Sequence, residues 1–123
     1  MVSTGGLYGA ARSTGYSGNM WISASGINDA SLRMNVVANN IANSNTDDFV
    51  PDRVDSVALP GGGTIGVFVA GNAGMLSDYE GSSLTDYATE GVNLILAKRA
   101  FEANARMLKA ENETSQALFD AIG

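Results

Sequence analysis

The sequence of 123 residues contains no cysteine and no histidine. Without these side chains it has no thiolate nucleophile, no imidazole base, no disulfide and no zinc or copper site of the usual nitrogen and sulfur type. Enzymes built on a Ser-His-Asp or Cys-His arrangement are therefore excluded. The absence of cysteine also suits a chain that must cross an oxidising compartment without forming wrong bridges.

Basic residues and long apolar runs are also scarce. Seven lysines and arginines stand against 13 acidic residues, so the formal net charge is −6. Because phosphate neutralisation supplies most of the affinity for nucleic acid, we expect no nucleic-acid binding. The unbroken apolar runs are only a few residues long and the first residues lack the charged and apolar regions of a signal peptide. We therefore expect neither direct membrane insertion nor a cleaved signal peptide.

The first 19 residues are rich in glycine and serine, and Arg12 is their only charged residue. Such a composition has little apolar surface to bury. We interpret residues 1–19 as a flexible leader, either a loose terminus or a segment that becomes ordered against a partner. The remaining residues, 20–123, are predicted to form a single domain.

Residues 20–43 are predicted to form the first helix. Apolar side chains recur there in steps of seven, three and four, which is the spacing of a heptad seam. Short polar side chains from Asn43 to Asp48 then favour a turn over further helix. The seam consists of Met20, Ile27, Ala30, Met34, Val37 and Ile41.

A row of amides lies on the same predicted helix. Asn35, Asn39 and Asn43 are spaced at i, i+4 and i+8, so they project from one face. Amides both donate and accept, so this row can bond a neighbouring helix without a charge to desolvate. The alternative is a solvated polar face.

Two β-branched runs, residues 53–59 and 64–70, surround the turn sequence Pro60-Gly61-Gly62-Gly63. This pattern predicts a β-hairpin, which with its following loop occupies residues 49–84. An isolated two-stranded ribbon is marginal in water. We therefore expect the hairpin to lean on the helices or on a neighbouring molecule.

Residues 85–122 contain no proline and a single glycine, Gly91. They predict a second helix about 57 Å long at 1.5 Å per residue, longer than the core of a small globule requires. Two apolar seams run along it, which favours packing between molecules as well as within one, although an ordinary helical hairpin stays open. The first seam is Leu96, Ala100, Ala103, Met107, Ala110, Thr114, Ala117 and Ala121; the second is Leu94, Phe101, Leu108 and Ile122.

The two seams are interpreted as having different partners. Ala100, Ala103 and Ala110 are small, so we expect the first helix of the same chain to lie against them. Phe101 and Leu108 are large, and we expect them to fill gaps to another subunit. The predicted fold is thus mainly α with a small β part, the two long helices pairing as a coiled-coil hairpin around the inserted β-hairpin.

The sequence contains no motif that predicts a cofactor or metal. Asn43, Asn45 and Asp47 alternate like calcium-loop ligands, but the required glycine and glutamate are replaced by Asp48 and Val54. The glycines after Pro60 lack the Lys-Ser/Thr of a phosphate loop. We expect no catalytic residue, no cofactor and no metal, and interpret the chain as not an enzyme.

Two segments resemble a known family. Residues 31–46, SLRMNVVANNIANSNT, resemble the N-terminal motif of bacterial flagellar axial proteins, the rod and hook family, in which N-x-x-A-N-N-x-A-N precedes a T-x-G-[FY] turn. Residues 92–104, VNLILAKRAFEAN, resemble the C-terminal motif, V-N-x-I followed by A-x-R-[AS]-[FY]-x-A-N. The short middle segment is most similar to that of proximal rod subunits.

This resemblance implies a structural subunit of the flagellar basal-body rod, which spans the periplasm, polymerising through its terminal helices into a helical axial tube. Its implied partners are copies of itself, other rod and hook proteins, and the flagellar type III export apparatus. The implied subunit interface contains Asn35, Asn39, Asn43, Leu94, Ala100, Phe101, Ala103, Leu108, Ala110 and Ile122.

The turn motif is Thr46, Asp48 and Phe49, and it departs from the family pattern, because Asp48 stands where the family has glycine. A glycine there indicates a positive φ, which aspartate tolerates better than most residues but less well than glycine, so either Asp48 accepts mild strain or the turn has another shape. Two alternatives stay open: a homopolymeric hook-like or filament-like axial protein, and a small helical adaptor or export chaperone.

Overall fold

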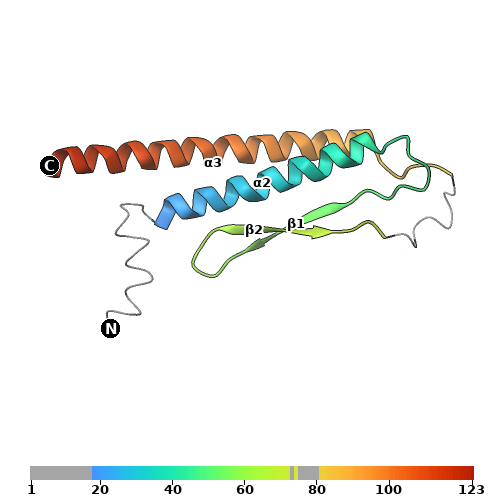
Figure 1. Ribbon diagram of the computed structural model, residues 1–123, viewed down its shortest axis with the longest axis horizontal. Helices are drawn as coiled ribbons and strands as arrows, with labels where there is room; N and C mark the ends of the chain where they lie inside the picture. The colour runs from blue at the N-terminus through green and yellow to red at the C-terminus, as the bar shows by residue number, and fades with distance from the viewer. Residues whose placement is uncertain (1–17, 73, 75–80) are drawn as a thin grey trace.

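The computed structural model describes residues 18–72, residue 74 and residues 81–123. Its elements are helix α2 (Gly18–Ala42), strand β1 (Arg53–Ala58), strand β2 (Thr64–Val69) and helix α3 (Tyr87–Ile122). They lie in three layers, with α2 between α3 and the hairpin (Figure 1). The predicted mainly helical fold with a small β part is confirmed. Residues 1–17 of the predicted leader lie outside the described residues, whereas Gly18 and Asn19 belong to α2.

Helices α2 and α3 run antiparallel. The Ser23 hydroxyl donates to Glu111 Oε2 at 3.5 Å near one end of the pair, and Asn40 Nδ2 donates to Glu90 Oε2 at 3.2 Å near the other. Between these contacts the helices come close at Gly26, where a Cβ would lie 2.5 Å from Asn104 Oδ1. Glycine at this position therefore permits the close approach, although it weakens a helix interior.

The hairpin packs on the opposite side of α2. The Thr64 amide donates to Ser25 Oγ at 3.1 Å, and the Ser56 hydroxyl donates to Asp29 Oδ2 at 2.6 Å. Arg33 donates to Asp29 Oδ2 at 3.2 Å and also to the Ser56 hydroxyl. The expectation that this ribbon leans on a helix is confirmed, and polar contacts hold it there.

The two strands pair antiparallel from Arg53 with Val69 to Ala58 with Thr64. Leu59 and Gly63 close the turn, the Leu59 amide donating to Gly63 O at 2.9 Å. Gly61, Gly62 and Gly63 have φ values of +90°, +104° and +86°, which explains the glycine run. The strands match the predicted segments to within one residue.

Helix α3 begins at a side-chain cap. Asp86 accepts from the Ala88 amide at 3.0 Å and from the Thr89 hydroxyl at 3.0 Å. These bonds, the Thr89 hydroxyl first, lower the pKa of Asp86 below its ordinary value. The helix therefore starts two residues later than predicted and ends at the predicted Ile122.

One row of α3 faces α2, and its members are spaced by three and four residues. Each is buried or half-buried, from the fully buried Glu90 and Ala97 to the half-buried Leu108. We call it the inner row: Glu90, Asn93, Ala97, Phe101, Asn104, Leu108 and Glu111.

The predicted roles of the two apolar seams are therefore wrong in part. Ala103 and Ala110, expected against the first helix, are exposed, and only Ala100 of those three is half-buried. Phe101 and Leu108, expected to face another subunit, are half-buried and belong to the inner row. The reason is that Glu90, Asn104 and Glu111 complete the inner row with polar side chains, which a search for apolar spacing passes over.

The contact between Gly26 and Asn104 predicts that Gly26→Ala changes the free energy of unfolding in opposite directions with and without the Asn104 side chain. Alanine favours a helix interior over glycine by about 1 kcal/mol, but Gly26→Ala must displace Asn104, so we expect a loss of stability. In an Asn104→Ala background the same change should become stabilising. Urea unfolding followed by circular dichroism at 222 nm measures both free energies of unfolding.

Gly91→Ala is the matched control, because a Cβ there would meet no atom within 4 Å. It should stabilise the protein in either background. If Gly26→Ala and Gly91→Ala stabilise the protein equally, the helices do not approach closely at Gly26.

Candidate functional site

Asn40 joins three parts of the fold. It is 1% exposed, and its Nδ2 donates to Asp52 O at 2.9 Å and to Glu90 Oε2 at 3.2 Å. Its Oδ1 accepts from the Asp52 amide at 2.9 Å. One amide side chain therefore binds both main-chain groups of the residue before β1, as a paired strand would, and also holds α3.

Glu90 completes this buried group. Its side chain is 1% exposed, and Oε1 accepts from Arg53 Nη1 at 3.0 Å. Arg53 Nη1 also donates to Asp52 O at 2.9 Å. We call Asn40, Asp52, Arg53 and Glu90 the polar node. Since a buried carboxylate is stable only when it is paired and hydrogen-bonded, each member depends on the others.

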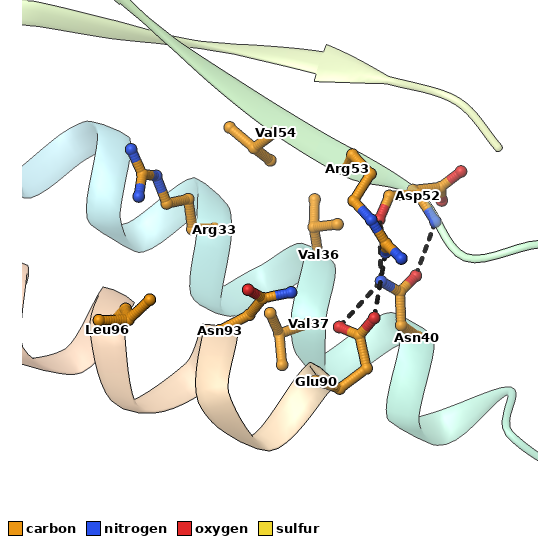
Figure 2. Close-up of a pocket in the computed structure, with 10 residues that line it drawn as sticks. All are labelled: Arg33, Val36, Val37, Asn40, Asp52, Arg53, Val54, Glu90, Asn93 and Leu96. Carbon is orange, nitrogen blue, oxygen red and sulfur yellow. Dashed lines mark hydrogen bonds and ion pairs between the residues drawn. The ribbon is translucent and has the colours of Figure 1, made fainter. Parts of the chain in front are cut away.

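The polar node borders a small cleft of about 120 Å³ between α2, α3 and β1. Figure 2 shows Glu90, Asn40 and Arg53 converging on one another. Asn93 and Leu96, which follow Glu90 along α3, also line the cleft. Ligand pockets usually enclose about 300–1,000 Å³. The cleft is thus too small to hold a typical organic substrate, and the polar side chains of Asn40, Arg53 and Glu90 at its border are bonded within the node.

The turn after α2 leads the chain into this node. The Phe49 amide donates to Thr46 O at 3.2 Å, and Asp48 has a φ of +60°. The expectation of a positive φ at Asp48 is confirmed. Its carboxylate also accepts from the Gly81 amide at 2.8 Å, and Phe49 O accepts from the Leu84 amide at 2.9 Å. The turn therefore holds the segment that enters α3.

Two family profiles match the chain, and their segments contain Asn40 and Glu90 of the node. The profile described as Flagella basal body rod protein matches residues 20–49, and Flagellar basal body rod FlgEFG protein C-terminal matches residues 82–121. Together they cover more than half of the sequence, and they contain most of α2 and α3. The chain belongs to the flagellar basal body rod protein family. A search of curated proteins finds no significant match.

Membership defines the general role of this rod protein. It is a structural protein of the flagellar basal body, from families that are not enzymes. Within the described residues no three acidic side chains gather as a metal site would require. No helix in the described part of the chain is long and apolar enough to cross a membrane.

The predicted interface residues of the rod protein fall into two groups. Ala100, Phe101 and Leu108 are half-buried beside α2, whereas Ala103, Ala110, Leu94 and Ile122 are exposed. Of the amide row, Asn35 and Asn39 are exposed, and Asn43 is half-buried. Asn43 Nδ2 donates to Asn39 O at 2.9 Å, and Asn43 Oδ1 accepts from Thr46 at 3.0 Å. The side chain of Asn43 therefore connects the last turn of α2 to the turn that follows it.

Sequence reasoning missed Asn40, Asp52, Arg53 and Glu90 as a group. Asn40 stands next to Asn39 in the family motif, but the i, i+4 spacing of the amide row includes Asn35 and Asn39 and leaves out Asn40. Glu90 lies two residues before the second motif, and a lone glutamate is usually exposed to solvent. The available signal was that Asn40 continues the buried face of α2, three residues after Val37.

Asp48 generates the prediction of this subsection. Asp48→Asn should leave stability nearly unchanged, because asparagine accepts the Gly81 bond and tolerates a positive φ. Asp48→Gly should be close to neutral, since it loses the bond but relieves strain. Asp48→Ala should be less stable than Asp48→Gly by about 1–2 kcal/mol, the penalty for a Cβ in this conformation. Urea unfolding measures the series.

Asp47→Ala is the control, because Asp47 is exposed and precedes the strained position. It should change stability by no more than about 0.5 kcal/mol. Equal stability of Asp48→Ala and Asp48→Gly would show that the turn imposes no strain.

Proposed function

We propose that this chain is a rod subunit that polymerises through its terminal helices, with copies of itself and other rod and hook proteins, into a helical axial tube. The antiparallel pair of α2 and α3 would form the wall as a coiled coil, in keeping with the 3-4 spacing of the inner row. We also propose that the subunit reaches the basal body through the flagellar type III export apparatus.

The observation that carries this proposal is a second face of α3 that α2 does not cover. Each of its residues lies two positions after a member of the inner row, which is about 200° round the helix. All six are exposed, Val92 and Ile95 each by 55%. We call it the outer row: Val92, Ile95, Arg99, Ala103, Arg106 and Ala110.

The composition of the outer row supports packing between subunits. Four of its residues are apolar, and Leu96 and Met107 beside it are 56% and 55% exposed. Ala103 and Ala110 would let a neighbour approach the α3 backbone closely. An extended apolar face of this kind marks an interaction surface. Two exposed members of the predicted interface, Ala103 and Ala110, belong to this row and are thus retained as proposed subunit contacts.

The test separates the two rows of α3. Ala103→Glu places a charge on the outer row, so it should leave the helicity of the dilute protein unchanged and block its polymerisation when concentrated. Phe101→Ala removes a half-buried ring from the inner row, so it should lower the free energy of unfolding of the monomer. Circular dichroism and a pelleting assay with negative-stain microscopy measure both effects.

The control is Asn112→Glu, which adds the same charge on an exposed part of α3 about 160° away from Ala110. It should polymerise like the unmodified protein. A wild-type protein that stays a compact monomer at every concentration would contradict polymerisation and favour the adaptor alternative.

A further inference from the structure

Two unpartnered apolar faces lie on opposite sides of the described structure. One is the outer row of α3, and the other is the face of the hairpin that points away from α2 (Figure 1). Strand alternation defines the second face: the Ser56 hydroxyl bonds Asp29 of α2, and a Cβ at Gly66 would meet Asp29 and Leu32, so the residues next to Ser56 and Gly66 project outward.

We call this second surface the hairpin face, and it is largely apolar. Its valines and isoleucine are between 40% and 50% exposed, although β-branched side chains are usually half-buried in sheets. One acidic residue, Asp55, stands in its middle, opposite Val67. The apolar members are Val57, Ile65, Val67 and Val69.

The outer row of α3 carries positive charge in its middle, opposite in sign to Asp55 on the hairpin face. Arg99 and Arg106 are exposed and form no ion pair within the described residues. Lys98 and Lys109, on another side of the helix, each have an acidic residue one turn further on at 3.9 Å. The two unpaired arginines thus lie among exposed apolar residues, as Asp55 does on the hairpin face.

The dimensions of the two faces also agree. A six-residue strand spans about 20 Å, and the outer row from Val92 to Ala110 spans about 27 Å. Arg99 and Arg106 lie about 10 Å apart along the helix axis. One carboxylate docked between them would therefore be within reach of both long side chains.

We propose that the hairpin face of one copy docks on the outer row of α3 of the next copy, with Asp55 placed between Arg99 and Arg106. This inference rests on the proposed self-assembly. Because the two faces differ and point away from each other, the contact is heterologous. A repeated heterologous contact that does not close into a ring builds an open helical polymer.

Charge reversal with mixing tests the contact. Asp55→Lys alone should raise the concentration needed for polymerisation by about tenfold or more, because it faces arginine with lysine. Arg99→Glu with Arg106→Glu should do the same, because it faces Asp55 with glutamate. An equimolar mixture of the two variant proteins should polymerise, since every contact then joins opposite charges. Sedimentation and negative-stain microscopy measure polymer.

The controls carry the same charge changes elsewhere. Asp47→Lys lies in the turn, and Lys98→Glu with Lys109→Glu lies on another side of α3; both should polymerise like wild type. Circular dichroism should show that every variant retains the helicity of the unmodified protein.

The outcomes separate this inference from the proposed function. If the wild-type protein polymerises and Asp55→Lys polymerises equally well, or the mixture remains unassembled, the docking of these two faces is wrong while self-assembly stands. If the wild-type protein never polymerises, both are wrong. Rescue by mixing supports the inference specifically, because a defect within one chain cannot be repaired by a second variant.

Discussion

A fully buried carboxylate determines how the three layers of this rod protein fit together. Glu90 lies where α3, the end of α2 and the start of β1 meet, and its side chain is almost wholly excluded from solvent. Burial of such a group is costly unless its oxygens are bonded, and here Asn40 occupies one oxygen and Arg53 the other. The segments that supply these partners must therefore stay in one arrangement.

The polar node bonds the pair of helices to the base of the hairpin, which would be only marginally stable on its own. The hairpin is joined to α2 by Ser25, Asp29 and Arg33 along its length and to the node at its base. Because α2 is thereby covered on both sides, two of the apolar surfaces that stay exposed in the described part of the chain are the outer row of α3 and the hairpin face. The same packing that stabilises the subunit thus defines the surfaces proposed for assembly.

Much of the fold was predictable because its signals are local. Heptad spacing predicted α2, a proline and glycine turn between β-branched runs predicted the hairpin, and the family pattern indicated a positive φ at Asp48. These features depend on a few adjacent residues, so the sequence displays them directly. The family assignment likewise depended on two short motifs and is confirmed.

The orientation of α3 was less predictable because two rows on it follow the same 3-4 spacing. Periodicity alone cannot say which row faces α2. Apolar content favoured the first apolar seam, which begins at Leu96, whereas the inner row is the one that faces α2. The inner row is identified by Glu90, Asn104 and Glu111, whose partners Asn40, Gly26 and Ser23 lie far away in the sequence. Such pairs become visible only when the helices are placed side by side.

Hydrogen exchange at the Asp52 amide tests the central role of the polar node most directly. This amide lies outside the strands and donates only to the Asn40 side chain among the described contacts. We expect this amide to exchange as slowly as the central amides of α2, and we expect Asn40→Ala to abolish this protection and to weaken that of the hairpin. The exposed Asn35→Ala should change neither. Rapid exchange at Asp52 in the unmodified protein, or protection that survives Asn40→Ala, would contradict the account.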